Sequence, residues 1–430
     1  MNELESTISQ VIEENFIPFE WNDKIEKELE EINLDTNLPR KDLTKIPFIT
    51  IDGADAKDFD DAVHCFKNKT TYSLSVAIAD VAEIVKLKSA INDEALERGT
   101  SIYFPSKVIP MLPEKISNNL CSLVPNEIRN VLVCEINFDL EGDLQSYNFF
   151  EARIKSHQRM TYSEVEEYLN GNSSHLAKNV KKSIDTLYVL TNKLLFKRNK
   201  RQALEIDGQE PLLKMSNDGR VEEITLPRRL FAHQMIEEAM LAANVCAANF
   251  MNKHYKFGVY RIHEEPDNLK LESLKNFFSL KGYSESYKKE ALGIISQCLS
   301  HAKKQQLNKI FQTVVLQSLK RAEYSTKEIG HFGLQLDRYS HFTSPIRRYP
   351  DLMTHRLIKN VLHNGDLALD KDQIEEDCAE MSDLERIAEK SSRQVTQQMI
   401  CYYLKRYIGK EFNAVVTCLL YTSPSPRDYT

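Results

Sequence analysis

The sequence predicts an α+β fold, in which helices surround a mixed, mostly antiparallel sheet. Apolar residues alternate over 71–85 and again over 129–154, as is typical of half-buried strands. Apolar residues at helical spacing cover 228–254 without an internal glycine or proline, and a second long helical pattern covers 371–407. At 430 residues, the chain is long enough for more than one domain.

Composition is that of an ordinary globular protein, with 42% hydrophobic and 28% charged residues. No apolar run approaches the ~20 residues of a membrane span, and the N-terminus lacks the basic start and apolar block of a signal peptide. We therefore expect a cytoplasmic protein with no membrane contact. The net charge of −7 argues against a protein that coats nucleic acid with a basic surface, but it permits a basic channel inside an acidic exterior.

The cysteines predict thiols rather than disulfides or a zinc site. They are scattered and form no Cys-x-x-Cys pair or His-Cys cluster at zinc spacing. We expect buried thiols in a reducing compartment at positions 65, 121, 134, 246, 298, 378, 401 and 418.

In chain order, an N-terminal helix precedes an acidic helical stretch over 22–32 and a turn-rich link. A short strand over 46–52 runs into a cluster of aspartates, and the short Asn-Lys-Thr segment before residue 71 suggests a hairpin. Residues 178–201 predict an amphipathic helix whose basic face is either solvated or turned toward RNA. Further on, His233, Glu237 and Glu238 form either a hydrogen-bonded polar edge of their helix or the border of a site.

The aspartate cluster is the most unusual feature of the sequence. Asp52, Asp55, Asp58, Asp60 and Asp61 lie within ten residues of one another. Two carboxylates ~4 Å apart repel by roughly 4 kcal/mol at an effective dielectric near 20, so something must compensate the charge. Water, protonation, basic side chains and divalent cations are the alternatives. Since neighbouring side chains on a strand point to opposite faces, the cluster is expected on an irregular loop.

A second dense stretch, 331–358, interleaves basic with aromatic residues, and six of the basic ones fall within nineteen residues: Arg338, His341, Arg347, Arg348, His355 and Arg356. Pro350 and the Gly365 stop predict a helix over about 350–363, which makes "TSPIRRY" the loop that leads into it. Arginines beside a helix N-terminus can seat a phosphate. Together with aspartates that share two divalent ions, they would suit hydrolysis of a phosphodiester. Taken alone, an aspartate-rich run is more often a solvated or calcium-binding loop than a two-metal site, although this one lacks the residue order of a calcium hand. The arginine and aromatic residues of 331–358 reverse that preference.

Tyr103 and Phe104 lie between turn signals within 98–123. Exposed aromatic rings there could stack on unpaired bases, worth roughly 1–3 kcal/mol each. Ordinary core packing is the equal alternative.

At this point the chain resembles the catalytic domain of the ribonuclease II and ribonuclease R family, from about residue 40 to 405. The wording of "GTSIYFP" and "PIRRYPDL" is closer to ribonuclease R. The motifs that carry the resemblance occur in the family's order: "TIDGADAKDFDDAV", "VAIADV", "RGTSIYFPSKVIPMLPE", "LCSL", "SHQRMTYSEV", "IEEAMLAAN", "YRIHEEP" and "STKEIGHFGLQLDRYSHFTSPIRRYPDLMTHRLI".

The resemblance implies a processive 3′-to-5′ exoribonuclease that degrades single-stranded RNA to nucleoside 5′-monophosphates, with a narrow RNA channel ending at the metals. The resemblance implies two Mg²⁺ ions as cofactors, with Mn²⁺ able to substitute. Matched by motif position, the metal-binding carboxylates are Asp52, Asp58, Asp60 and Asp61, with Asp60 closest to catalysis and Asp55 in support. Tyr103 would stack on the terminal base, and Arg347 would contact the scissile phosphate with Arg348 beside it.

The domains expected are an N-terminal helical linker over 1–44, the catalytic domain over 45–407, and the start of a truncated OB-type RNA-binding domain over 408–430. The end of that last segment resembles translated adapter sequence, which suggests a truncated reading frame. We expect a monomer. The rival hypotheses are an RNA-binding protein of the same family whose site has decayed, and a two-metal phosphatase or DNA nuclease.

Overall fold

The computed structural model describes residues 2–32, 39–172, 176–204, 211–216, 218–283, 287–288, 290–304, 308–365 and 370–412. The predicted OB-type segment therefore lies mostly outside the described residues. The domain boundaries proposed from the sequence stay predictions.

A six-stranded sheet forms the centre of the molecule, in the order β1-β8-β2-β3-β4-β7. Its strands are β1 (Lys41–Asp42), β2 (Phe48–Asp52), β3 (Asp61–Lys67), β4 (Thr71–Ala79), β7 (Ile128–Asp139) and β8 (Leu144–Thr161). Both β1 and β2 run parallel to β8, and the other neighbours are antiparallel, which confirms the predicted mixed, mostly antiparallel sheet.

The long strand β8 closes the sheet on itself. Its first part pairs with β7 and its last part pairs with β2, so hydrogen bonds run around the circuit β8–β2–β3–β4–β7–β8. Short pairs lie outside it: β5 (Ile102–Phe104) with β6 (Lys107–Ile109), β9 (Leu212–Met215) with β10 (Val221–Thr225), and β11 (Tyr260–Ile262) with β12 (Glu323–Ser325).

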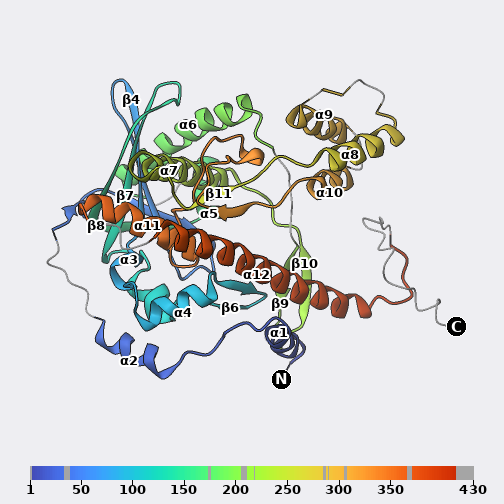
Figure 1. Ribbon diagram of the computed structural model, residues 1–430, viewed down its shortest axis with the longest axis horizontal. Helices are drawn as coiled ribbons and strands as arrows, with labels where there is room; N and C mark the ends of the chain where they lie inside the picture. The colour runs from blue at the N-terminus through green and yellow to red at the C-terminus, as the bar shows by residue number, and fades with distance from the viewer. Residues whose placement is uncertain are drawn as a thin grey trace.

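Helices surround the sheet, as predicted (Figure 1). They are α1 (Glu3–Glu14), α2 (Asp23–Glu31), α3 (Val81–Ile84), α4 (Ala90–Arg98), α5 (Tyr162–Leu169), α6 (Lys178–Lys200), α7 (Phe231–Tyr255), α8 (Asn268–Leu280), α9 (Ala291–Lys304), α10 (Asn308–Ser318), α11 (Tyr349–Leu362) and α12 (Lys371–Lys405), with a π-helix at Lys115–Leu120 and a 3-10 turn at Phe332–Leu334. The predicted strand over 71–85 is wrong in its second half, since β4 ends at Ala79 and α3 follows.

Strand alternation distributes the core over two sides of the sheet. Ile49 and Ile51 belong to a hydrophobic cluster with α6 and α7, whereas Phe48 on the same strand packs in a second cluster with α4 and α11. The apolar face predicted for 178–201 therefore packs against the sheet.

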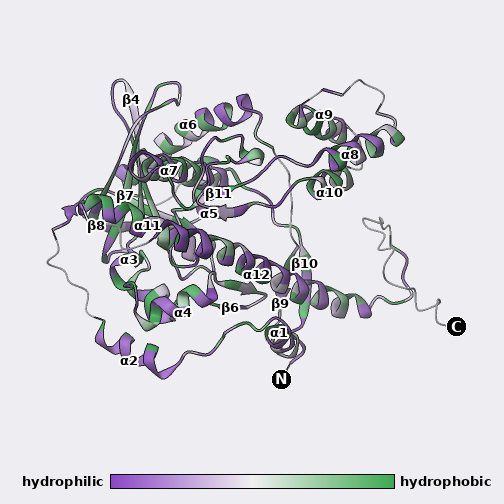
Figure 2. Ribbon diagram, in the orientation of Figure 1, coloured by the Kyte–Doolittle hydropathy of each residue, from purple (hydrophilic) through white to green (hydrophobic). Residues whose placement is uncertain are grey.

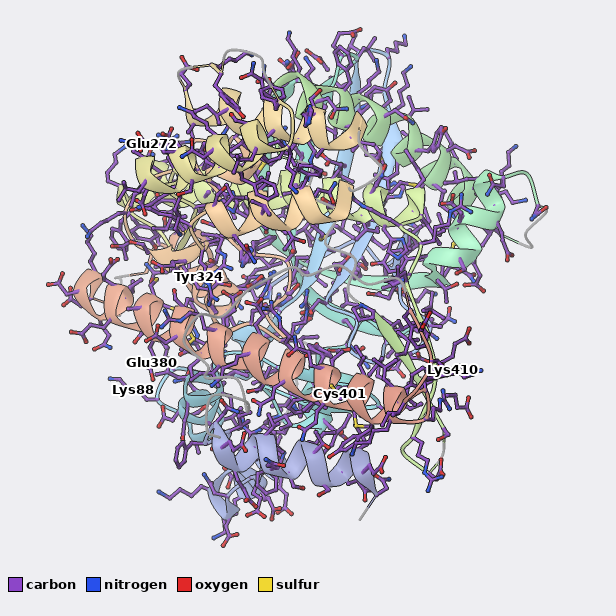
Figure 3. The ribbon with its side chains drawn as sticks, turned by 90° about the vertical axis from the view of Figure 1, so that its right-hand side faces the viewer. Lys88, Glu272, Tyr324, Glu380, Cys401 and Lys410 are labelled. Carbon is purple, nitrogen blue, oxygen red and sulfur yellow. The ribbon has the colours of Figure 1, made fainter. Side chains whose placement is uncertain are left out.

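Helix α12 crosses the molecule and reaches α1 and the β9–β10 hairpin (Figure 1). Figure 2 shows hydrophobic and hydrophilic stretches alternating along it, as expected of a helix with one buried stripe. Tyr324, labelled beside this helix in Figure 3, donates its backbone N–H to Ser382 Oγ of α12 at 2.8 Å. Behind β5, the stripe packs with α1 around Ile102 and Phe104.

The cysteines that the structure describes are free, and six of them are buried as predicted. Cys401 is exposed instead, and Cys418 lies outside the described residues. Within the described part of the chain, none of the helices combines the length and apolar character needed to cross a lipid bilayer.

Candidate active site

The aspartates lie where two antiparallel strands converge. Asp52 is the last residue of β2 and Asp61 is the first residue of β3, and the irregular loop 53–60 joins them. The predicted loop is confirmed. Because the loop is held at both ends by the central sheet, its carboxylates are fixed relative to one another.

The four motif aspartates line one cavity of about 820 Å³. Tyr103, Arg347 and Arg348 line the same cavity, so all the residues that the sequence assigned to the site come together. Asp55, which was assigned only a supporting role, lies exposed on the loop.

The arginine loop reaches the aspartates through one backbone bond and one ion pair. The backbone N–H of Ile346 donates to Asp60 Oδ1 at 2.9 Å, and Arg347 Nε lies 3.8 Å from Asp60 Oδ2. Pro350 begins α11 directly after this loop, as predicted. Two segments far apart in the sequence thus meet at Asp60, a side chain that is 6% exposed.

The two neighbouring arginines differ in freedom. Arg348 donates from Nη2 to the buried Asp351 at 2.9 Å, and its side chain is 18% exposed. Arg347 donates to Ser344 Oγ at 3.1 Å, and its side chain is 42% exposed. Arg347 is therefore the better placed of the two to contact a ligand in the cavity.

The β5–β6 hairpin presents Tyr103 to the cavity. Tyr103 is 42% exposed and donates its hydroxyl to Asp58 Oδ2 at 3.4 Å, whereas Phe104 is buried. Core packing is thus the correct interpretation for Phe104, and exposure is correct for Tyr103. The carbonyl of Arg347 accepts hydrogen bonds from Ser101 N and Thr100 Oγ1, both at 3.0 Å, which ties this segment to the arginine loop.

Burial and neighbouring carboxylates raise the pKa values of Asp52, Asp60 and Asp61. Burial raises the pKa of Asp60 to about 8, although Arg347 and the Ile346 N–H act against it. Burial and the charge of Asp58 raise the pKa of Asp52 to about 6. Burial and the charges of Asp52 and Asp60 hold the pKa of Asp61 well above its usual range. The cations nearby do not neutralise the cluster.

The residues fit a hard cation. The Oδ2 atoms of Asp52 and Asp61 are buried and accept no hydrogen bond within the described part of the chain. Burying a carboxylate oxygen that accepts no hydrogen bond costs free energy unless a cation binds the oxygen instead. Carboxylate oxygens are the ligands that Mg²⁺ prefers.

Sequence reasoning did not assign roles to several residues of the cavity, among them Tyr162, Arg261 and His341. His341 accepts from or donates to the Tyr324 hydroxyl at 2.8 Å, and burial with nearby Arg348 and Arg261 holds its pKa well below the usual range, so the imidazole is neutral. All three residues fall inside motifs that carry the family resemblance, and their position there was the feature of the sequence that could have marked them as site residues.

The polar edge of α7 is mostly structural. Arg198 of α6 forms ion pairs with Glu237 at 2.6 Å and with the buried Glu238 at 2.9 Å. His233 Nδ1 accepts the backbone N–H of Leu230 at 3.1 Å. Glu237 also lines the cavity, so both predicted alternatives apply to it.

Comparisons with known proteins agree with this geometry. A family profile described as the RNB domain matches residues 40–364. Ribonuclease R of Vibrio parahaemolyticus is 38% identical over 427 residues, which cover 93% of this chain and 50% of that protein. Ribonuclease R of Escherichia coli is 35% identical and is covered to 52%. The chain thus spans about half the length of the curated relatives that it matches.

Solved structures of Mycoplasma genitalium RNase R are also similar. Its complex with ribose-methylated single-stranded RNA has a TM-score of 0.89 at 32% identity and covers 95% of this chain and 66% of that one. Its complex with double-stranded RNA has a TM-score of 0.92, with 97% and 76% covered. The yeast pseudonuclease Ssd1 has a TM-score of 0.74 at 18% identity, which concerns the fold alone.

Proposed function

The chain belongs to the RNB-domain family of exoribonucleases, and on that premise we propose that it removes nucleotides processively from the 3′ end of single-stranded RNA as nucleoside 5′-monophosphates. One observation carries this proposal: four aspartates and Arg347 gather in one cavity. A nucleic-acid backbone brings phosphates, and this cavity offers carboxylates for cations together with an arginine for the phosphate itself.

Asp52, Asp58, Asp60 and Asp61 would hold the metal, which we propose to be two Mg²⁺ ions. When bound, the ions would supply an activated water and compensate charge on the reacting phosphate. Without a cation, the charged form of Asp60 is unfavourable, because burial raises its pKa to about 8. Its carboxyl would therefore give up a proton near neutral pH when a cation arrives.

Arg347 is the proposed phosphate ligand of the chain. Its guanidinium lines the cavity beside Asp60. Nη2 donates to Ser344 Oγ, whereas Nε lies 3.8 Å from the Asp60 carboxylate, too far for a hydrogen bond, so this N–H can still donate to a ligand. A fixed cation there would stabilise negative charge as it grows on the phosphate during attack. Arg348 is held by its hydrogen bond to Asp351, so we propose that it stabilises the loop and adds positive charge to the site without contacting the reacting phosphate.

Tyr103 is the proposed stacking platform for the terminal base. Its ring is exposed in the cavity wall while the hairpin beneath it is packed. Ring stacking is tolerant of sequence, which suits an enzyme that must accept each base in turn. The hydroxyl donates to Asp58 Oδ2 at 3.4 Å, a long bond, so we assign the stacking to the ring rather than to the hydroxyl.

The test is degradation of a 5′-labelled single-stranded RNA with Mg²⁺, with products sized over time. We expect shortening from the 3′ end, release of 5′-monophosphates, and no comparable loss of a DNA of the same sequence. Replacing Tyr103 by Ala should change the length of the final product, whereas Tyr103→Phe should retain it. Absence of mononucleotide release, or equal digestion of DNA, would contradict the proposal.

The pseudonuclease likeness makes a binding-only protein the alternative worth separating, because the fold by itself does not secure catalysis. A decayed site would be expected to have lost at least one of its ligands, whereas all four aspartates and Arg347 are present here. RNA binding without Mg²⁺-dependent cleavage in the parental chain would favour that alternative.

A further inference from the structure

Two side chains from outside the cavity hold the aspartate loop from opposite ends. We infer that Arg159 and Ser122 are positioning residues that keep loop 53–60 in the shape in which its carboxylates share a metal. The inference rests on the metal site of the proposed function. Arg159 belongs to the motif "SHQRMTYSEV" and Ser122 to the motif "LCSL", and neither residue is among those assigned to the site above.

The loop has little internal support. In the part of the chain that the structure describes, one backbone hydrogen bond joins two residues of 53–60: the N–H of Ala56 donates to the carbonyl of Gly53 at 3.2 Å. Asp52, Asp58 and Asp60 bring their carboxylates into one cavity, where like charges repel one another. A loop of this kind needs outside contacts to keep its charged groups together before a cation binds.

Arg159 supports the first half of the loop. The parallel pairing of β2 with β8 sets Arg159 opposite Thr50, directly before the loop begins. From there, Arg159 Nη2 lies 2.7 Å from the carbonyl oxygen of Ala54, 3.3 Å from that of Gly53 and 3.5 Å from that of Ala56. Its guanidinium also lies over the ring of Phe59, 5.1 Å from the centroid.

Ser122 supports the second half. Its fully buried Oγ accepts the backbone N–H of Phe59 at 3.0 Å and donates to the carbonyl of Lys57 at 2.8 Å. These two bonds flank Asp58. The next residue, Leu123, donates its N–H to the carbonyl of Phe59 at 3.0 Å and so adds to the same support.

Neither residue lines the cavity, and Ser122 is fully buried. They act through the loop backbone, and Arg159 in addition brings a positive charge that lowers the repulsion at Asp52. Their loss should therefore weaken metal binding even when no RNA is present. Residues that orient metal ligands typically contribute about 10- to 100-fold to metal affinity.

The experiment measures Mn²⁺ and Mg²⁺ binding to the full chain by calorimetry without RNA, with circular dichroism to verify folding. We expect Arg159→Ala and Ser122→Ala to weaken metal binding about tenfold or more. Arg159→Lys keeps the charge but not the planar fork, so its loss should be smaller than that of Arg159→Ala.

Matched controls are Arg153→Lys, earlier on β8 and outside the cavity, and Ser391→Ala, a fully buried serine of α12 whose Oγ has no hydrogen-bond partner in the described residues. The controls should bind metal within twofold of the parent. If a variant is too unstable for calorimetry, the rise in Tm on adding Mg²⁺ is measured instead. This rise should be smaller in the variant than in the parent.

Metal binding by folded Arg159→Ala and Ser122→Ala that matches the controls would overturn the inference and leave the proposed function standing. A parental chain that binds metal but does not degrade RNA would overturn the function and leave the inference standing.

Discussion

Two acidic clusters of this protein look alike in composition and differ in what compensates them. Asp80, Glu83 and Glu151 bring carboxylate oxygens within 4.8 Å of one another, a spacing that a metal ion could use. Lys359 Nζ instead lies 2.8, 2.9 and 3.0 Å from these three groups, and Arg40 Nη2 lies 2.6, 3.2 and 3.2 Å from them.

The pKa values record the difference. Burial acts to raise the pKa of Asp80, but Lys359 and Arg40 outweigh it and hold that pKa below its usual value. At Asp60, burial raises the pKa to about 8 because Arg347, 3.8 Å away, compensates only in part. Clustered carboxylates are thus a structural ion network where cations of the chain sit among them, and a candidate metal site where they do not.

The largest expected effect is that of Asp60→Asn. Removing this carboxylate should lower kcat by about a thousandfold or more, since several kcal/mol of charge compensation at the phosphate would be lost at 1.36 kcal/mol per tenfold. Stability without metal should be retained or increased, because the uncompensated group is gone. Single-turnover cleavage and thermal unfolding in EDTA measure the two; cleavage at the parental rate would remove Asp60 from the site.

Lys359→Met should turn the compensated cluster into an uncompensated one. Removing one partner of a buried ion pair typically costs about 3–5 kcal/mol. The three carboxylates would keep Arg40, with Lys86 at Glu83 and His363 at Glu151 on the more exposed side. Urea denaturation should show this loss of unfolding free energy, with kcat per folded molecule nearly unchanged. A parental denaturation midpoint would show that the cations do not stabilise this cluster.

Arg347→Ala should impair catalysis with little loss of stability, the opposite of the effect expected for Lys359→Met. Loss of one preorganised charge donor typically lowers kcat about 10²- to 10³-fold. The half-exposed side chain contributes little to packing, so Tm should stay close to that of the parent. RNA binding with Ca²⁺ in place of Mg²⁺ serves as a control, and a drop in Tm equal to that of Lys359→Met would argue for a structural role instead.

The smallest effect is a pH dependence with a defined sign. Asp52 and Asp60 titrate near 6 and 8 in the folded chain, above the ~3.9 of an unfolded aspartate, so the folded chain binds more protons in between. Without metal, stability from these groups is present below about pH 4 and is lost as pH rises toward 8. Thermal unfolding in EDTA should therefore show Asp60→Asn gaining on the parent as pH rises, and Mg²⁺ should reverse this at pH 8. A gap that closes with rising pH would refute the assignment.

Local patterns in the sequence were sufficient for most long elements. Helical spacing located α7 and α12, and alternation located β7 and β8, because each pattern reports its own burial. The neighbouring Asp60 and Asp61 were enough to predict a loop. The run after Ala79 was misread as strand, since a short apolar segment has no period long enough to separate strand from helix.

Contacts between distant segments were out of reach. Nothing in the run from Leu144 to Thr161 indicates that one strand pairs with β7 and then with β2. The ion pairs that occupy Glu237 and Glu238 depend on Arg198 of another helix. Alternation within β5 decides that Tyr103 is exposed and Phe104 buried, but only once that three-residue strand is known. The family resemblance, not periodicity, identified Arg347 and Tyr103.

The closed circuit of strands also bears on how the protein opens. β2 pairs with β8 over its whole length and with β3 at Ile49↔Val63, and β3 pairs with β4 over its whole length, so detaching either strand breaks pairing with two neighbours. Amide hydrogens there should exchange with solvent among the slowest in the chain, at a rate set by global unfolding. Since each strand has a neighbour on both sides in the described residues, neither is an edge strand of the kind that recruits a strand from another molecule and begins aggregation.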